Sequence, residues 1–250
     1  MGRTWVVTGG SRGIGRAVVD RALAEGDTVH VLARSVDRES WAPAVRDRVL
    51  PVPVDVADPE SVGAAFAAVE RATGAVDVLV NAAGVHRGGR VDQLGDAAWA
   101  EVLTTNLTGA FTTIRAVLPL LADGAAIVNI GAVVGLRGYP GDVAYGSAKA
   151  GLSGLTQTLA MELAPRGVRV NLVVPGFVDT TMTAGLTETS RAAIIDGIPV
   201  GRPGRADEIA DVVWAVAHAS YMTGSTIAVD GGLMASFGAP ARRARGTATR

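Results

Sequence analysis

Short apolar runs alternate with longer helical patterns along nearly the whole chain, and this alternation limits the possible folds more than any other feature. The runs are almost continuously apolar, as in strands of a parallel sheet that helices cover on both faces. No repeat, linker or shift of composition divides the 250 residues, of which 48% are hydrophobic. We therefore expect one α/β domain with a doubly wound parallel sheet of about seven strands. The predicted strands are 4–8, 28–33, 49–54, 76–81, 125–130, 168–174 and 226–229, and the predicted helices lie near 15–25, 59–72, 96–121, 144–163 and 206–217.

Charge and residue usage argue against several classes of function. The formal net charge is −1, with 23 basic and 24 acidic residues and no basic stripe inside the domain. Nothing therefore favours binding to nucleic acid or to an anionic membrane. The absence of cysteine excludes disulfides and thiolate metal sites. His30, His86 and His218 show no ligand spacing, so we expect no metal.

The two ends of the chain carry different signals. The amino-terminal residues lead directly into a strand and a glycine pattern, and no apolar run is long enough to cross a bilayer. We therefore expect a soluble, cytoplasmic protein. Segment 239–250 is polar, arginine-rich and without periodicity, so we interpret it as a loose basic tail behind a domain that covers 1–238. An electrostatic contact between this tail and a partner is the alternative.

A glycine-rich turn, TGGSRGIG, follows the first predicted strand. Gly9, Gly13 and Gly15 have the spacing G-x-x-x-G-x-G at a strand-to-helix turn. Such glycines allow a tight turn and let backbone N–H groups and a helix N-terminus approach a pyrophosphate. We expect a dinucleotide site here, to which Ser11 and Ile14 also contribute, in a Rossmann-type domain. A purely structural turn is the alternative.

The residues after the second strand indicate which dinucleotide binds. An NAD enzyme places an acid here for the ribose hydroxyls, whereas this chain has Ala33 followed by Arg34. Arg12, in the glycine turn, should approach the same ribose. Two guanidinium groups without an acid suit a 2′-phosphate, so we expect NADP(H) rather than NAD(H). The alternative is that both arginines are ordinary solvated surface residues.

Tyr145 and Lys149 are four positions apart in a predicted helix, which puts both side chains on one face. Such a pair can transfer a proton to a carbonyl oxygen, although this chemistry usually needs a hydroxyl as a third group. The sequence reads Gly131-Ala132 where that hydroxyl would be sought.

Several ordered motifs resemble the short-chain dehydrogenase/reductase family from about residue 3 to residue 235. Within the family, IPVGRPGRADEIA and YMTGSTIAVDGG are most similar to 3-oxoacyl-[acyl carrier protein] reductases and related ketoreductases of secondary metabolism. The motifs are TGGSRGIG at 8–15, DV at 55–56, NAAG at 81–84, Asn106 in NLTGAF, YGSAK at 145–149 and PGFVDT at 175–180.

The resemblance implies a role for each motif residue. Tyr145 would be the general acid in ketone reduction, and Lys149 would hold the nicotinamide ribose and lower the tyrosine pKa from its free value near ~10. Asn106 would anchor a water that connects Lys149 to solvent. Cofactor contacts would come from Asp55 and Val56 at the adenine, from Asn81, Ala82 and Gly84 on the adenosine side, and from Pro175, Gly176, Val178 and Thr180 at the nicotinamide amide.

The family pattern fails at one position. The serine of relatives lies thirteen residues before the tyrosine, and here that position is Ala132. Loss of one such hydrogen-bond donor typically costs about 10²–10³-fold in rate, which predicts a handicapped enzyme rather than a dead one. Three explanations stay open. The substrate or another side chain, such as Tyr139, Asp142 or His86, supplies the missing donor; the chain is an engineered Ser-to-Ala variant; or it is a catalytically silent partner subunit.

The substrate and the assembly follow from the same resemblance. Segment 181–197 forms helices over the substrate in relatives, and here Met182, Leu186, Ile194 and Ile195 would make it apolar. The leading substrate is therefore a β-ketoacyl thioester on a carrier protein, which Arg137, Arg166 and Arg202 could contact; free ketones and hydroxysteroid-like alcohols stay open. The helical patterns at 96–121 and 144–163 are apolar on more than one face, and relatives pair them, so we expect a homotetramer or homodimer.

Overall fold

Seven parallel strands form one sheet with the order β3-β2-β1-β4-β5-β6-β7. The computed structural model describes residues 2–236, and the predicted tail, 239–250, lies outside the described residues. The strands are β1 Thr4–Thr8, β2 Thr28–Ala33, β3 Val49–Pro53, β4 Val76–Asn81, β5 Leu121–Ile130, β6 Arg169–Pro175 and β7 Thr226–Val229. The helices are α1 Gly13–Ala24, α2 Pro59–Thr73, α3 Asp96–Leu103, α4 Gly109–Val117, α5 Val143–Leu163, α6 Glu188–Asp196 and α7 Ala206–His218. The predicted fold class is confirmed.

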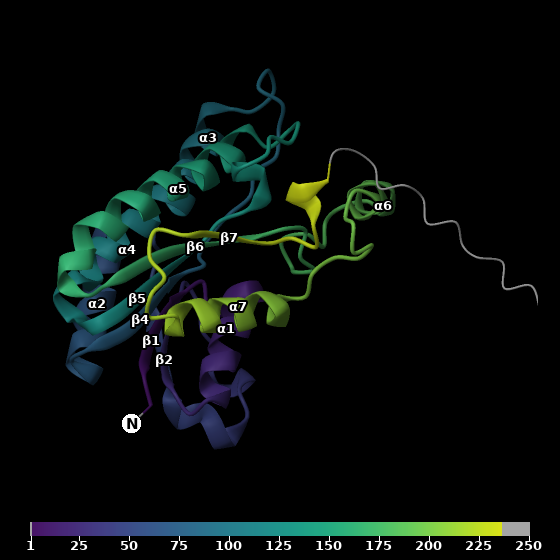
Figure 1. Cartoon of the computed structure of the whole chain (residues 1–250). Helices are drawn as coiled ribbons and strands as arrows, with labels where there is room; N and C mark the ends of the chain where they lie inside the picture. The colour runs from purple at the N-terminus through teal and green to yellow at the C-terminus, as the bar shows by residue number, and fades with distance from the viewer. Residues whose placement is uncertain (1, 237–250) are drawn as a thin grey trace, which may run out of the picture.

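Helices cover both faces of the sheet (Figure 1). Helices α1 and α7 pack on one face, and α2, α4 and α5 pack on the other. Strand β1 shows why: Trp5 and Val7 lie in the core beneath α1 and α7, whereas Val6 lies in the opposite core, and none of the three is exposed. Alternate side chains of a strand point to opposite faces of the sheet. A run that is apolar at every position is therefore buried on both faces.

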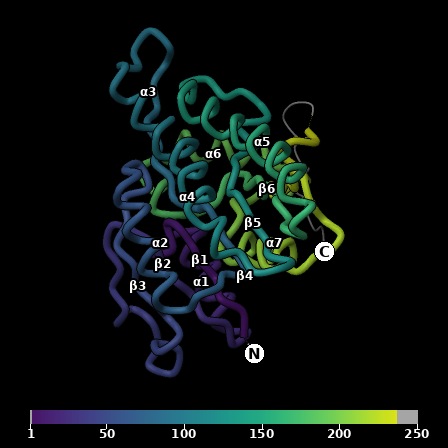
Figure 2. Tube along the Cα trace, turned by 90° about the vertical axis from the view of Figure 1, so that its left-hand side faces the viewer, coloured from purple at the N-terminus to yellow at the C-terminus, as the bar shows by residue number. Residues whose placement is uncertain are grey.

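The strand order reverses between β1 and β4, because β2 and β4 flank β1 on its two sides. Connections therefore leave the carboxyl ends of β1 and β4 in opposite directions, which opens a crevice at that edge of the sheet. The tube view in Figure 2 shows β1, β2 and β4 side by side at the base of this edge. The glycine turn after β1 and the NAAG motif after β4 both begin there.

The predicted helix 96–121 is the element that differs most from the prediction. It divides into α3, a π-helical turn over Thr104–Thr108 and α4, and it ends before Pro119, whose ring removes a backbone donor. Strand β5 then begins at Leu121 rather than at residue 125, because Leu121 pairs with Val76 before a register shift.

Helix α6 was not among the periodic helices that we predicted, although it lies within the segment 181–197 where the family resemblance implied helices. None of its residues is buried, so it lacks the apolar stripe that a periodicity search detects. No helix in the described part of the chain is long and apolar enough to span a membrane.

Candidate active site

A cleft of about 950 Å³ runs along the carboxyl ends of the strands. All the predicted site residues except Asn81 and Asn106 line it, so residues that are distant in sequence meet in one place. The predicted residues in its wall are Gly9, Ser11, Arg12, Gly13, Ile14, Gly15, Arg34, Asp55, Val56, Ala82, Gly84, Ala132, Tyr145, Lys149, Pro175, Gly176, Val178 and Thr180.

The glycine turn has the backbone shape that close approach of a phosphate requires. Gly9 and Gly13 adopt φ values of +68° and +56°, which side chains other than glycine rarely tolerate. A Cβ atom on Gly15 would lie 2.4 Å from the carbonyl oxygen of Gly9. Only glycine at position 15 therefore lets the first turn of α1 approach the glycine-rich loop this closely. The amide groups of the α1 N-terminus therefore face the cleft without side-chain obstruction, as a pyrophosphate site needs.

Two arginines stand at the β1–β2 end of the cleft. Arg12 and Arg34 both line the cleft and are both exposed to solvent. Among residues 2–236, no carboxylate forms an ion pair with either guanidinium. The nearby Asp55 uses one carboxylate oxygen to accept a hydrogen bond from the Ala57 N–H at 3.0 Å. This end of the cleft therefore offers two cations to an anionic group.

Tyr145 and Lys149 project from the first turns of α5 into the other end of the cleft. Lys149 is buried, and its Nζ donates a hydrogen bond to the Ile130 carbonyl oxygen at 2.8 Å. Burial lowers the pKa of the Lys149 ammonium to about 8. The Nζ atom lies 5.5 Å from the centre of the Tyr145 ring, so the predicted pair does meet.

The expected effect of Lys149 on its neighbour is wrong for the protein without cofactor. Burial, followed by the negative charge of Asp142, raises the pKa of Tyr145 to about 12 rather than lowering it. The reason is geometric: the ammonium bonds to the Ile130 carbonyl, whereas the Asp142 carboxylate stands at the start of the same helix as the phenol.

The two asparagines that do not line the cleft are tied to the backbone or to other side chains. Asn106, in the π-helical turn, accepts from the Val85 N–H at 2.9 Å and donates to the Val85 carbonyl oxygen at 2.8 Å. Asn81 donates to Asn129 at 2.9 Å and accepts from Thr113 at 2.7 Å. The Asn81 side chain therefore takes part in a buried polar network, and its predicted place on the adenosine side of the cofactor stays a prediction.

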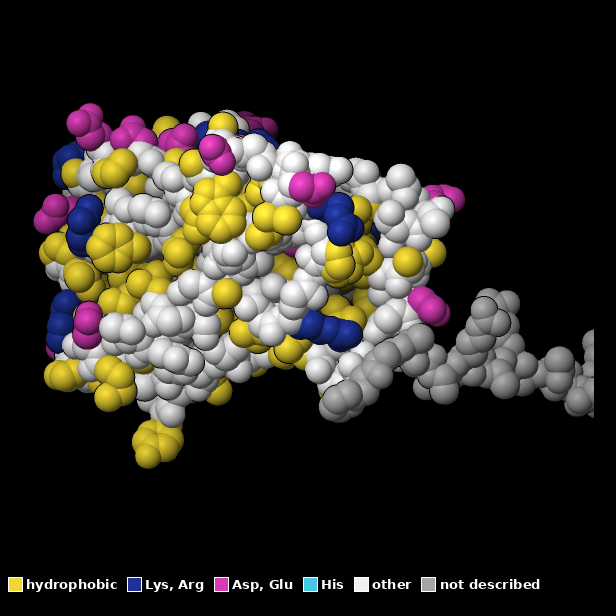
Figure 3. Space-filling model, turned by 90° about the horizontal axis from the view of Figure 1, so that it is seen from above, with side chains coloured by type: hydrophobic (Ala, Val, Ile, Leu, Met, Phe, Trp, Pro, Cys, Tyr) yellow, Lys and Arg dark blue, Asp and Glu magenta, His cyan; other side chains and the backbone are white. Residues whose placement is uncertain are grey.

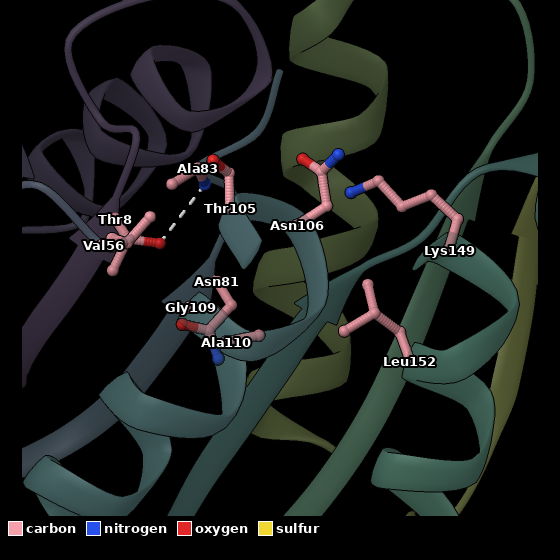
Figure 4. Close-up of a pocket in the computed structure, with 10 residues that line it drawn as sticks. All are labelled: Thr8, Val56, Asn81, Ala83, Thr105, Asn106, Gly109, Ala110, Lys149 and Leu152. Atoms are coloured by element: carbon pink, nitrogen blue, oxygen red, sulfur yellow. Dashed lines mark hydrogen bonds between the residues drawn. The ribbon is translucent and has the colours of Figure 1, made fainter. Parts of the chain in front are cut away.

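A small cavity of about 10 Å³ lies behind the catalytic end of the cleft. Both asparagines and Lys149 contribute to its wall, and Figure 4 shows the Lys149 side chain extending toward the Asn106 amide. This volume is roughly the space that one water molecule needs, and the wall is polar enough to bond it.

The position of the missing serine lies in the cleft wall at the end of β5, where Ala132 offers a methyl group. Of the three proposed replacements, Tyr139 is 54% exposed and does not line the cleft. His86 does line it, and its Nε2 lies 2.7 Å from the Asp142 Oδ1. Its ring also meets the Tyr145 ring edge to face, with centres 5.1 Å apart.

The residues predicted for the lid lie at or near the cleft, whereas those predicted for the carrier protein do not. Met182 lines the cleft and is 47% exposed, and Leu186 is also exposed close by in the chain. By contrast, none of the three arginines suggested for a carrier protein lines the cleft. Arg137 donates to the Leu233 carbonyl, Arg166 donates to the Leu118 carbonyl, and Arg202 is paired with Glu208.

Sequence reasoning missed a tryptophan at the adenosine end of the cleft. Trp41 lies in its wall beneath the Arg16 guanidinium, which is 3.8 Å from the ring centre, and its Nε1 donates to Asp20 at 2.8 Å. The available signal was an aromatic residue in an otherwise polar segment after β2.

Comparisons with known proteins agree with this geometry. Residues 9–234 match the family model described as enoyl-(acyl carrier protein) reductase. The 3-oxoacyl-[acyl-carrier-protein] reductase FabG of Vibrio harveyi is 39% identical over 240 residues, which cover 93% of this chain and 97% of the relative. Carbonyl reductase family member 4 of Danio rerio is 42% identical over 236 residues, which cover 93% and 98%. A mutant short-chain dehydrogenase/reductase of Serratia marcescens superimposes with a TM-score of 0.86 at 32% identity, over 93% of this chain and 98% of that one.

Sheet order, cleft and sequence identity together define an oxidoreductase of the doubly wound α/β class. The chain belongs to the short-chain dehydrogenase/reductase family, which confirms the predicted resemblance. Within that family it is homologous to proteins named 3-oxoacyl-[acyl-carrier-protein] reductase in several bacteria.

Proposed function

We propose that the protein is an NADPH-dependent ketoreductase that reduces a carbonyl group to a secondary alcohol. One observation carries the proposal: a tyrosine and a buried lysine on one helix face line the same cleft as a glycine turn shaped for a pyrophosphate. The names of the relatives, 3-oxoacyl-[acyl-carrier-protein] reductase and carbonyl reductase, agree with that chemistry.

The residues present fit a nicotinamide dinucleotide with a 2′-phosphate. Gly9, Gly13 and Gly15 would bind the pyrophosphate, and Arg12 and Arg34 would bind the 2′-phosphate with charge-assisted hydrogen bonds. No acid stands next to β2 to accept bonds from free ribose hydroxyls, which supports NADP(H) over NAD(H). At the opposite end, Pro175, Gly176, Val178 and Thr180 would hold the nicotinamide amide.

The bound cofactor would supply the hydride that forms the new C–H bond at the carbonyl carbon. Tyr145 would donate its phenolic proton to the carbonyl oxygen, which takes the electron pair of the C=O π bond and becomes a hydroxyl. The raised pKa of Tyr145 keeps that proton in place at neutral pH in the free protein. Lys149, whose pKa is lowered to about 8, would then return a proton to the phenolate.

The small cavity beside Lys149 supports a route for resupplying that proton. Its wall includes Asn106, whose side chain is fixed by two hydrogen bonds to Val85. The π-helical turn leaves the Asn106 backbone outside the regular helical ladder, and one water in the cavity could bond to it and to the ammonium. Such a water would connect Lys149 toward solvent.

The leading substrate is a β-ketoacyl thioester on a carrier protein. An apolar group at the cleft mouth, Met182, and the exposed Leu186 nearby suit an acyl chain better than a sugar. Eight relatives of comparable length include seven named as reductases of carrier-bound 3-oxoacyl groups. Arg137, Arg166 and Arg202, which we suggested for contact with a carrier, lie outside the cleft lining and bond within the chain.

We further propose that copies of the chain associate through the helices on the α3–α5 side. Trp99 on α3, Phe111 on α4 and Met161 on α5 are 41%, 45% and 79% exposed. The face drawn in Figure 3 carries several groups of hydrophobic side chains among polar ones. Burial of such residues between copies would remove apolar area from water. A mass measurement in solution that gives a monomer would contradict the proposal.

The decisive experiment follows NADPH or NADH consumption with a panel of β-ketoacyl thioesters and simple ketones. We expect turnover with NADPH and a thioester. The competing idea, a cofactor-binding subunit without activity, would show NADPH binding and no turnover with any ketone. The intact Tyr145, Lys149 and Asn106 favour the enzyme, because a silent subunit needs none of them.

A further inference from the structure

The catalytic end of the cleft contains an ion pair that the family motifs do not explain. His86, two residues beyond the NAAG motif, lies with its Nε2 2.7 Å from the Asp142 Oδ1, although 56 residues separate the two in the chain. The imidazole is 37% exposed, and the carboxylate is 18% exposed. His86 therefore stands in the wall of the cleft, partly exposed, with Asp142 bonded to it from outside the cleft lining.

The backbone holds this pair in place. Gly89 and Asp142 form a parallel bridge between the loop after β4 and the start of α5, and the Gly89 N–H donates to the Gly141 carbonyl at 2.7 Å. The loop that carries His86 is thus fastened to the helix that carries Tyr145. The edge-to-face contact of the two rings, with centres 5.1 Å apart, follows from this attachment.

We infer that the His86–Asp142 pair supplies the hydrogen bond to the substrate oxygen that a serine hydroxyl supplies in relatives. This inference depends on the proposed ketoreductase function. His86, Ala132 and Tyr145 line one cleft, and the described chain provides no hydroxyl at position 132. A donor on the His86 side of Tyr145 would share the carbonyl oxygen with the phenol and stabilise the charge that develops there.

The hydrogen bond between His86 and Asp142 determines which protonation state of His86 can donate to the substrate. A carboxylate has no proton to give, so the imidazole Nε2–H donates to Asp142. The other ring nitrogen, Nδ1, bonds to no residue of the described chain, and it carries a proton only in the imidazolium form. The substrate oxygen therefore receives a hydrogen bond only while His86 is protonated, and the Asp142 carboxylate stabilises that form.

The charged groups around His86 are few. Asp142 and Tyr145 face the ring from α5, and from α3 Glu101 pairs with Arg87, whose Nη1 also donates to the His86 carbonyl oxygen. Because Arg87 is already paired, Asp142 is the charge that acts directly on the imidazole.

The test compares four proteins: the natural chain, His86→Ala, Ala132→Ser and the double variant. We expect His86→Ala to lower kcat by about 10²–10³-fold, the size of a lost oxyanion donor. Addition of Ala132→Ser to His86→Ala should restore most of that activity. The NADPH dissociation constant, measured by fluorescence titration, should stay within about twofold in all four, because none of the changes alters the glycine turn or the arginines.

Two further variants make the test specific. Asp142→Asn removes the carboxylate that accepts from the His86 Nε2–H at 2.7 Å, so kcat should fall toward the value of His86→Ala. Tyr139→Phe is the matched control, because Tyr139 is exposed outside the cleft and should leave the rate unchanged.

The outcomes separate this inference from the proposed function. If Ala132→Ser reduces ketones and the natural chain does not, the reductase stands and His86 does not replace the serine. If His86→Ala keeps full activity, or if Ala132→Ser fails to rescue it, the inference is likewise overturned. If every protein binds NADPH and none reduces a ketone, the proposed function fails and the inference fails with it.

Discussion

The two ends of the cleft are built in different ways. The pyrophosphate end depends on backbone shape, with Gly9 and Gly13 at positive φ and Gly15 pressed against the Gly9 carbonyl. The end that we propose binds the carbonyl depends on individual side chains, and there the chain has Ala132 where we predicted that relatives carry a serine. A backbone shape that only glycine permits has no substitute, whereas a hydrogen bond can be donated from a neighbouring loop. This contrast explains why the motif is complete at one end and altered at the other.

The largest effect is expected at the carbonyl end, for Tyr145→Phe. Loss of the phenolic proton should lower kcat by about 10²–10⁴-fold, the usual contribution of a positioned acid. The NADPH dissociation constant should change little, because the phenol is not part of the phosphate-binding turn. A variant that retains more than about a tenth of the activity would mean that another group protonates the substrate.

The pH dependence of stability tests the fold independently of the two ends of the cleft. His30 on β2 is buried, and burial lowers its pKa from 6.5 to about 4. The unfolded chain therefore takes up a proton first as the pH falls below 6.5, so the free energy of unfolding is fully maintained above that pH and decreases toward pH 4. The decrease should reach about 3 kcal/mol. Urea unfolding at several pH values measures it.

A matched variant controls that measurement. His30→Leu should show a flatter dependence of stability on pH over the same range, whatever its stability at neutral pH. An unchanged slope would assign the acid sensitivity to other groups.

The preference for NADPH tests the charge at the adenosine end. Arg34→Ala should weaken NADPH binding by about 10- to 100-fold, the range for loss of a hydrogen bond to a charged group, and should change NADH binding little. Arg12→Ala should act in the same direction. Arg71→Ala on the exposed face of α2 serves as the control and should change neither. Equal weakening of both cofactors by Arg34→Ala would remove the argument for a 2′-phosphate site.

An effect of similar or smaller size is expected for Gly15→Ala, which tests the backbone argument itself. The new Cβ would meet the Gly9 carbonyl oxygen at 2.4 Å, so the turn must shift, at a cost of about 1–3 kcal/mol in stability or cofactor binding. Gly63→Ala, inside α2 where a Cβ meets nothing within 4 Å, should instead stabilise the protein by about 0.5–1 kcal/mol. If the two variants behave alike, the close approach of the turn is unimportant.

The fold could be predicted from the sequence because the strands are largely apolar and helical patterns separate most of them. Strand β7 has the predicted bounds, and α2, α5 and α7 differ from the prediction by a single residue at one end. The break in the predicted helix 96–121 could not be located, since a π-helical turn at Thr104–Thr108 has no periodic signature. It arises from tertiary contact, in which Asn106 bonds to Val85 in the preceding loop.

The candidate site could be predicted only where a residue belongs to a local motif. The glycine turn and the Tyr145–Lys149 pair each lie within a few residues, so spacing alone brings them together. The contact of His86 with Asp142 joins two loops through a backbone bridge, and the sequence offered His86 only as one candidate among three. Asn81 shows what a motif leaves out: the sequence did not indicate that its side-chain amide bonds to Asn129 and Thr113.

The most direct test of hydride transfer in this cleft uses NADPH that carries deuterium at the transferable C4 position. The natural chain should place one deuterium on the carbinol carbon of the product of a β-ketoacyl thioester, as detected by mass spectrometry, and Tyr145→Phe should form little product at equal NADPH occupancy. A protein that binds NADPH at this cleft but forms no deuterated alcohol from any ketone would contradict the account.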